Sequence, residues 1–355
     1  MIAPENPPPR RRRVASRRSG IVLAAILLAA LVAFALSRLD LHRIGHALIT
    51  ATPGWIALAL ALMAMSLLLR SVSWHQTLRA ALPETSIPWA PVVRATMIGV
   101  MASALLPGRV GEPSRVFVLT RRLEGPIRRQ LPVVAGTVFS QTLINLLALA
   151  VLLAVTFTSV PLFHGRQAGI ATALAIPLAV GTLVLLGPRL LALARRSPWL
   201  RVALAANAVT RLLSLARRGL VVFARPRYGF TAISAQLLAW ALQWLACYAV
   251  VLALGLQSHA TLLTAAAILL AVNVSAILPA TPSNVGVFQA ACLVVLAAYG
   301  VGAGPGLAYG IILQAVEVLT ALALGVPALL GEGLRWQDVR AGGTRVERSA
   351  GEGAE

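Results

Sequence analysis

The 355-residue chain has no lysine and few charged residues of any kind, which make up 12% of its composition. Hydrophobic residues make up 58%, and the mean hydropathy is +0.82. A soluble domain of this length needs far more polar surface, so we predict an all-α polytopic membrane protein. The net charge of +20 comes entirely from arginine, and the positive-inside rule explains it better than nucleic-acid binding does.

Catalytic and metal-binding motifs are also missing from the sequence. It has no phosphate-binding glycine loop and no catalytic triad, and His75, His164 and His259 are isolated, without metal-ligand spacing. The two cysteines, Cys247 and Cys292, lie in apolar segments, which predicts buried thiols rather than a disulfide framework. We therefore expect no enzymatic activity, no cofactor and no metal site.

Apolar runs are abundant and predict six full membrane spans. These are residues 21–36, 55–69, 131–157, 168–186, 230–256 and 307–330. Two further apolar segments, 89–106 and 261–278, each end at a proline-containing turn, which predicts that they do not cross. We expect Trp55, Trp74 and Trp89 to anchor the protein at the membrane interfaces.

The remaining parts of the chain are polar or basic. Residues 1–19 and 331–355 are expected to be a disordered cytoplasmic head and tail, which leaves 20–330 as the transmembrane domain. The range 189–227 holds nine arginines interleaved with apolar residues. This pattern predicts a basic amphipathic segment on the anionic cytoplasmic surface of the membrane.

The arginine positions also predict the orientation of the chain. The head, the tail and the ranges 109–129 and 189–227 hold 25 of the 31 arginines. If all four are cytoplasmic, as expected in a bacterial inner membrane, the segment around Pro107 enters and leaves from the cytoplasm. Residues 261–300 then enter and leave from the outside, which predicts two opposed re-entrant hairpins. Non-helical backbone at that depth requires protein or water to satisfy it, and so implies a cavity.

An internal repeat supports this arrangement. The pattern Ser-Ala-(Leu or Ile)-Leu-Pro ends at Pro107 and again at Pro279, 172 residues later (279 − 107). The same offset aligns two pairs of spans and predicts inverted-repeat halves of about 55–157 and 227–329. Broken helices in matched positions of two halves indicate a transporter's binding site. The expected hinge residues are Pro107, Gly108, Gly111, Pro279, Pro282 and Gly286.

The two breaks contain the first candidate binding residues. In the first break, Arg109, Glu112 and Arg115 are charged, and a guanidinium binds phosphate with two parallel hydrogen bonds. A broken helix also offers free backbone N–H groups to an anion. The alternative is a cytoplasmic loop that obeys the positive-inside rule. In the second break, Ser283 and Asn284 either line a polar path or cap two half-helices.

The other candidates lie within the predicted spans. Glu317 is the only acidic residue inside a full span, and Gln314 lies one turn before it. The repeat offset places Asn145 and Gln141 at the corresponding positions of the first half. A charged side chain at the centre of a membrane helix costs roughly 2.5–3.5 kcal/mol on insertion scales, so it is usually functional and paired. We hypothesise that Glu317 pairs with Arg109 or Arg115; the alternative is a structural hydrogen bond between helices.

Three motifs resemble the transmembrane region of lysylphosphatidylglycerol synthases, the flippase-like integral membrane family. They are Arg70-(x)3-Trp74, Leu106-Pro107-Gly108-Arg109-(x)-Gly111-Glu112-(x)2-Arg115 and Leu278-Pro279-(x)2-Pro282-(x)3-Gly286-Val287. The resemblance covers roughly residues 20–330 and implies a membrane domain that moves a lipid across the bilayer. It also implies a lipid-handling role for Pro107, Arg109, Gly111, Glu112 and Arg115.

Two features depart from that family. Its bifunctional members carry a soluble aminoacyl-transferase domain after the membrane region, whereas this sequence ends at Glu355, so we expect no lysylphosphatidylglycerol synthesis. The second motif reads Pro282-Ser283-Asn284 where the family often has Pro-Gly-Gly, which predicts a less permissive turn.

The expected function is translocation of a phospholipid or a polyprenyl-phosphate-linked lipid across the inner membrane. The expected partners are membrane lipids with an anionic headgroup, together with a lipid-modifying enzyme or a glycosyltransferase. One alternative is a secondary transporter of a small anionic or polar solute, which requires a sealed path between two gates. The other is a membrane scaffold for a glycosyltransferase or lipid synthase that transports nothing.

Overall fold

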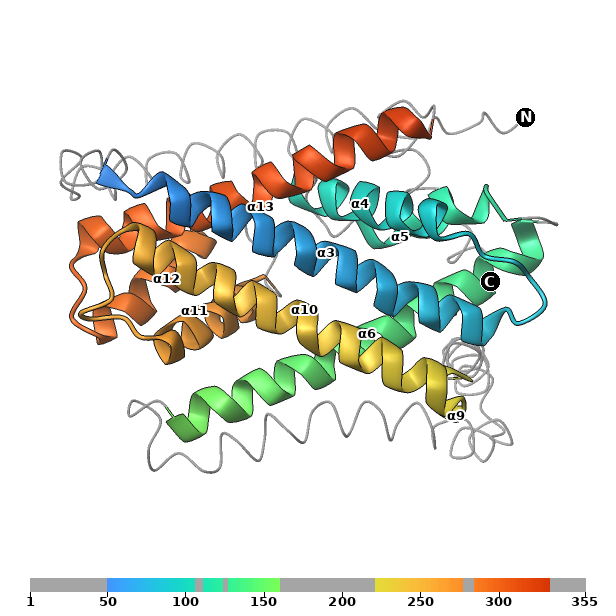
Figure 1. Ribbon diagram of the computed structural model, residues 1–355, viewed down its shortest axis with the longest axis horizontal. Coiled ribbons are helices and arrows are strands. Elements are labelled where there is room, and N and C mark those ends of the chain that lie inside the picture. Colours follow the sequence, from blue (N-terminus) through green and yellow to red (C-terminus); the bar gives the residue numbers. More distant parts are fainter. Residues whose placement is uncertain (1–49, 106–110, 124–126, 160–220, 277–283, 333–355) are drawn as a thin grey trace, which may run out of the picture.

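The structure is a computed structural model that describes residues 50–105, 111–123, 127–159, 221–276 and 284–332. In these ranges the regular structure is helical, and we find no strand (Figure 1). The helices are α3 (Pro53–Ala81), α4 (Trp89–Leu105), α5 (Gly111–Thr120), α6 (Ile127–Ser159), α9 (Val221–Ala224), α10 (Pro226–Ala253), α11 (Leu262–Ser275), α12 (Val287–Ala298) and α13 (Ala303–Gly331).

Four helices, α3, α6, α10 and α13, are long and apolar enough to cross a membrane. With 29 residues each, α3 and α13 are about 43 Å long, more than the hydrocarbon thickness of about 30 Å. They correspond to four of the six predicted spans. The other two, 21–36 and 168–186, lie outside the described residues, as do the head and most of the basic range 189–227.

Local sequence explains where several helices begin. Pro53 and Pro226 stand in the first turn of α3 and α10, where a missing backbone N–H costs nothing. At the start of α11, Thr261 and Thr264 form a reciprocal capping box, which satisfies two backbone N–H groups. Leu58, Leu238 and Leu319, on three of the long helices, are exposed in the isolated chain, as expected of side chains that face lipid.

The helices α3 and α10 pack against each other and run in opposite directions (Figure 1). Near one end, the Thr52 N–H donates to the Ala253 carbonyl at 2.9 Å. Farther along, the Ser66 hydroxyl donates to the Ala239 carbonyl at 2.8 Å. Small residues at such contacts let two helix backbones approach closely. The opposite directions agree with the prediction from the arginine positions.

The shorter helices form two antiparallel pairs at opposite ends of the bundle (Figure 1). In the first pair, Arg94 near the start of α4 and Arg122 after the end of α5 both bind the carboxylate of Glu332, at 3.3 and 2.6 Å. Both open ends of this pair therefore meet the C-terminal end of α13. In the second pair, α11 and α12, His259 before α11 lies beside Gly300 after α12, so these open ends also lie together.

Each long or paired helix of the first half has a counterpart about 172 residues later. The counterparts are α3 and α10, α4 and α11, α5 and α12, and α6 and α13. Exchanging all partners also preserves which helices touch: α4 packs on α3, α5 and α13, whereas α11 packs on α10, α12 and α6. The bounds and the contacts of the helices thus repeat together.

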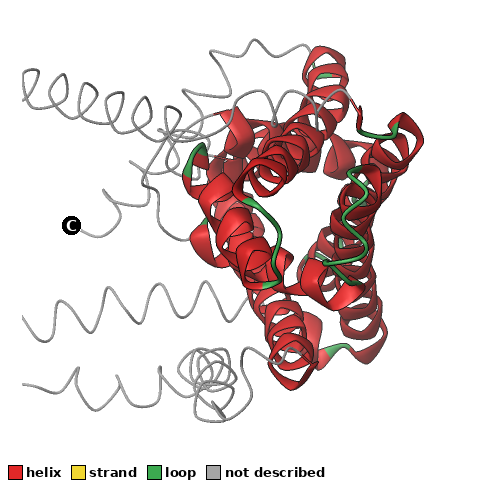
Figure 2. Ribbon diagram, turned by 90° about the vertical axis from the view of Figure 1, so that its left-hand side faces the viewer, coloured by secondary structure: helices red, strands yellow, loops and turns green. Residues whose placement is uncertain are grey.

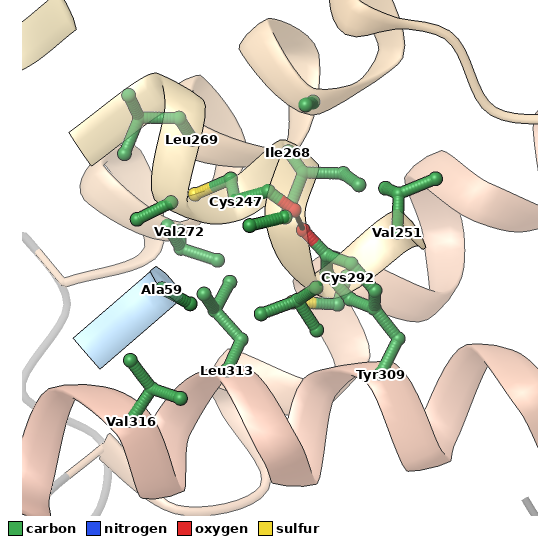
Figure 3. Close-up of a cluster of buried hydrophobic side chains, with 14 of the residues drawn as sticks. Ala59, Cys247, Val251, Ile268, Leu269, Val272, Cys292, Tyr309, Leu313 and Val316 are labelled. Carbon is green, nitrogen blue, oxygen red and sulfur yellow. Dashed lines mark hydrogen bonds between the residues drawn. The ribbon is translucent and has the colours of Figure 1, made fainter. Parts of the chain in front are cut away.

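The largest apolar core of the described residues lies where α3, α6, α10, α11, α12 and α13 meet, and Figure 3 shows part of it. Tyr309 is fully buried there, and its hydroxyl donates to the Cys247 carbonyl at 2.8 Å. Cys247 and Cys292 are free, buried thiols, as predicted. Figure 2 shows the described helices end-on, joined by short loops.

Candidate functional site

Arg70 lies inside the bundle, at the eighteenth of the 29 residues of α3. Its Nη2 donates to Gln243 Oε1 of α10 at 2.5 Å, and its guanidinium lies 5.9 Å from the ring centroid of Trp240. Glu317, the fifteenth residue of α13, hydrogen-bonds with the Gln243 side chain and interacts electrostatically with Arg70. Gln243 therefore links a cation of α3 to a carboxylate of α13.

Arg115 forms a second buried cationic centre. It lies on α5 with 8% of its surface exposed, and it forms an ion pair with Glu112 one turn earlier. Its Nη1 donates to Gln141 Oε1 of α6 at 2.7 Å. Its guanidinium also stacks over Trp74, 4.9 Å from the ring centroid. An aromatic face, an amide and a carboxylate thus hold this cation in place.

Gln141 connects the two cationic centres. While its Oε1 accepts from Arg115, its Nε2 donates to the backbone carbonyl of Arg70 at 3.0 Å. The two guanidiniums are close enough for their charges to interact. We call Arg70, Glu112, Arg115 and Glu317 the charge cluster; Gln141 and Gln243 join its members.

The remaining predicted polar residues, Asn145 and Gln314, each accept hydrogen bonds from a neighbouring helix. Asn145 Oδ1 accepts from Gln236 Nε2 and Trp240 Nε1, each at 2.9 Å, and so ties α6 to α10. Gln314 Oε1 accepts from Gln289 Nε2 of α12 at 2.5 Å, as Gln141 accepts from Arg115 of α5. The second half therefore has a neutral amide pair where the first half has a cation and an amide.

Gly111, one of the predicted hinge residues, lets α5 pack closely against α4. It is the first residue of α5, and a Cβ built there lies 2.0 Å from both the Gly99 carbonyl oxygen and the Ser103 hydroxyl. A side chain at this position would force α5 away from α4 and move Arg115, which also touches Gly99.

The second break contains a tight turn. Asn284 has a φ of +56° and Gly286 a φ of +88°, both in the left-handed region. Asparagine tolerates this region better than most other non-glycine residues, so it can replace a glycine here. The Gly286 N–H donates to Gln289 Oε1 at 2.7 Å, which joins the turn to α12. Pro107, Gly108, Arg109, Pro279, Pro282 and Ser283 lie outside the described residues.

Two expectations need correction. Glu317 does not pair with Arg115, because Arg115 is occupied by Glu112 and Gln141 on its own side of the cluster. Among the described residues the cation near Glu317 is Arg70, and the other predicted partner, Arg109, lies outside them. Trp74 is not an interface anchor: it is 0% exposed, and its Nε1 donates to Thr137 Oγ1 at 3.1 Å. Trp55 and Trp89 are 40% and 41% exposed and remain candidates for that role.

The sequence does not predict the roles of three residues. Arg70 belongs to one of the family motifs, but the apolar run that stops at Leu69 predicts that a span ends there, whereas α3 continues to Ala81. Its spacing of four from Trp74 was the available signal, because it places both side chains on one helix face. In the sequence, Gln243 is a polar residue within the predicted span 230–256, and nothing there indicates its bond to Arg70. Glu332 lies in the tail that the sequence predicts to be disordered, but its side chain is 2% exposed and forms ion pairs with Arg94 and Arg122.

These features define a multi-pass α-helical membrane protein with a charge cluster in the middle of its helix bundle. The family described as the lysylphosphatidylglycerol synthase TM region matches residues 21–325, and the chain belongs to that family. No curated protein sequence matches the chain. The predicted resemblance is therefore confirmed over most of the chain, and the residues of the charge cluster fall within the matched range.

Proposed function

We propose that this protein translocates a lipid with a phosphate-bearing headgroup across the membrane. The observation that supports this most is the charge cluster. Arg70 and Glu317 lie near the middle of two helices long enough to span the bilayer, and Gln141 of a third joins Arg70 to Arg115 of α5. Ionisable groups at that depth are costly and typically mark a substrate or ion pathway. Membership of a family named for a lipid synthase agrees with a lipid substrate.

The proposed architecture is an inverted repeat with two re-entrant hairpins. Repeated helix bounds, exchangeable contacts and opposite directions of α3 and α10 support the repeat. The meeting of Arg94 and Arg122 at Glu332 supports a first hairpin that enters and leaves on one side. In this arrangement the two breaks approach the middle of the membrane from opposite sides, as alternating access requires.

In this proposal the headgroup binds at Arg115 and Arg70 while the acyl chains remain in lipid. Guanidiniums suit phosphate because they donate two parallel hydrogen bonds. Arg109 lies outside the described residues, and its part in headgroup binding stays a prediction. The protein acts as a translocase and not as an enzyme, so net movement runs down a gradient of the lipid or of an ion.

The proposed location is the bacterial inner membrane, with both termini in the cytoplasm. The Glu332 end of the bundle then faces the cytoplasm, and the loop between α10 and α11 faces outward. A lipid-modifying enzyme or glycosyltransferase is the proposed source or recipient of the lipid.

Lipid transfer in proteoliposomes tests this function. Purified protein would be reconstituted with labelled phosphatidylcholine, phosphatidylglycerol, an aminoacylated lipid or a polyprenyl phosphate, and the label in each leaflet would be measured over time. The decisive variant is Arg115→Gln, which keeps a polar side chain but removes the cation beside Glu112. The matched control is Arg121→Gln, an exposed arginine at the end of α5 that packs against Phe117.

We expect wild-type protein and Arg121→Gln to transfer at least one phosphate-bearing lipid. Loss of a charged hydrogen bond is worth about 1.5–3 kcal/mol, so Arg115→Gln should slow transfer roughly tenfold or more. If folded wild-type protein transfers none of the lipids, translocation is the wrong function. Uptake of a small anion by the same vesicles would then favour a solute transporter.

A further inference from the structure

Counted over the described residues, the charge cluster is electrically balanced. It contains two guanidiniums, Arg70 and Arg115, and two carboxylates, Glu112 and Glu317. A monoanionic headgroup that enters it therefore adds one uncompensated negative charge. In a medium of low dielectric constant such a charge is expensive unless a positive charge arrives with it.

The cluster nevertheless has donors ready for an anion. The Nε atoms of both Arg70 and Arg115 are buried, and neither has a hydrogen-bond partner among the described residues. A buried N–H without a partner costs about 1–3 kcal/mol, so two such donors favour a ligand that brings acceptor oxygens. Phosphate oxygens are suitable acceptors.

The two carboxylates differ in how firmly they are held as anions. Glu112 stands in the first turn of α5, where the helix dipole favours negative charge, and it contacts Arg115 directly. Glu317 stands mid-helix and reaches Arg70 through the Gln243 amide. A protonated carboxyl group can still accept from or donate to an amide, so Glu317 can take up a proton and keep this contact.

Among the groups around Glu317, its own carboxylate is the one best able to accept a proton. Four groups interact electrostatically with Glu317: Arg70 of α3, Cys247 of α10, Cys292 of α12 and Tyr309 of its own helix. The charged residue of α4, Arg94, is engaged by Glu332. Cationic Arg70 retains its charge throughout, and the thiols and the phenol are neutral donors or acceptors.

We infer that Glu317 couples lipid transfer to protons by taking up one proton for each anionic headgroup that binds between Arg70 and Arg115. The proton enters from the water on the side where the lipid binds, rests on the Glu317 carboxylate and leaves to water on the other side. One monoanion and one proton then cross together, and no net charge moves. This inference rests on the proposed lipid translocation.

The test uses the same proteoliposomes with a pH gradient. Labelled phosphatidylglycerol is the anionic probe, because its phosphodiester stays ionised, and labelled phosphatidylcholine is the zwitterionic probe. The readout is the steady-state ratio of label between the two leaflets, with an ionophore clamping the membrane potential. Glu317→Gln removes the proton acceptor at nearly constant shape, and Glu317→Asp keeps a carboxylate at that position. The matched control is Glu84→Gln, which removes an exposed carboxylate between α3 and α4, outside the charge cluster.

With a gradient of about two pH units, roughly a hundredfold in proton activity, we expect phosphatidylglycerol to accumulate in the leaflet on the alkaline side. A one-to-one coupling drives that ratio toward roughly a hundredfold, and tenfold is enough to detect it. Phosphatidylcholine should stay evenly distributed. Glu317→Gln should abolish the accumulation, whereas Glu317→Asp and Glu84→Gln should keep it.

The outcomes separate this inference from the proposed function. If phosphatidylglycerol crosses but ends evenly distributed under the gradient, the coupling is refuted while translocation stands. If neither lipid crosses, the proposed function fails as well. If Glu317→Gln stops all transfer, Glu317→Asp decides: accumulation of phosphatidylglycerol by that variant supports a carboxylate at this position as the proton acceptor, and transfer without accumulation, or no transfer, overturns the inference.

Discussion

At the scale of single residues, the role of a tryptophan near a membrane surface depends on the side chains beside it. Trp55, Trp74 and Trp89 all stand near helix ends in the sequence, but only Trp74 is buried. It is buried because Arg115 stacks on its ring and Thr137 accepts from its indole N–H. Trp74 is therefore better interpreted as the packing partner of Arg115 than as an interface anchor.

Arg70 offers the sharpest test at this scale. Replacing it by Gln removes the cation that faces Glu317 and leaves that carboxylate without its nearby positive charge. We expect lipid transfer to fall roughly tenfold or more, since interactions with charged groups are worth about 1.5–3 kcal/mol. The control is Arg79→Gln on the same helix, where the arginine contacts only the Tyr228 ring in the structure described. Equal transfer by both variants, measured in proteoliposomes, would remove Arg70 from the site.

At the scale of helices, the first hairpin depends on close contact between α4 and α5. Gly111 touches the Gly99 backbone and the Ser103 hydroxyl, and the outer ends of the hairpin are held by Glu332. These contacts fix the position of Arg115, because it extends from α5 across Gly99 toward α6. The arrangement explains why a glycine in the motif serves packing as well as turning.

Gly111→Ala tests this packing. The added methyl group would lie 2.0 Å from two oxygens, one of them in the backbone, so the helices must separate. Overpacking of this kind costs roughly 1–3 kcal/mol, and we expect a lower free energy of unfolding in detergent. Gly54→Ala is the control, because a Cβ there meets nothing within 4 Å. A Gly111→Ala protein as stable as Gly54→Ala would show that the two helices are not in close contact.

At the scale of the whole molecule, the two halves share their helices but not their charges. Arg70, Glu112 and Arg115 all belong to the first half, and only Glu317 comes from the second. Where the first half has Arg115 with Gln141, the second has Gln289 with Gln314. In the proposed alternating access, movement of one half against the other would change the contacts of a cluster assembled from both, and so couple headgroup binding to the conformational change.

The sequence predicted the long helices well because each is a long apolar run, and apolar length is what a bilayer selects. It also identified Glu112, Arg115, Gln141 and Glu317 as polar exceptions in or beside such runs. It did not predict their partners, because pairing depends on how α3, α5, α10 and α13 pack. The role of Arg70 was not predicted because a charged residue after an apolar run resembles the end of a span. The role of Glu332 was not predicted because a glycine-rich tail resembles a disordered segment.

The last prediction concerns which end of the bundle faces the cytoplasm. In protein whose two native cysteines are replaced by alanine, single cysteines would be introduced at Glu84, between α3 and α4, and at Ser258, between α10 and α11. Both positions are exposed, and they lie at opposite ends, because α3 and α10 are antiparallel. In intact cells a membrane-impermeant maleimide should label Ser258→Cys, and it should label Glu84→Cys only after the membrane is opened. Labelling of both from outside would contradict a bilayer-spanning α3, and the reverse pattern would invert the orientation deduced from the arginines.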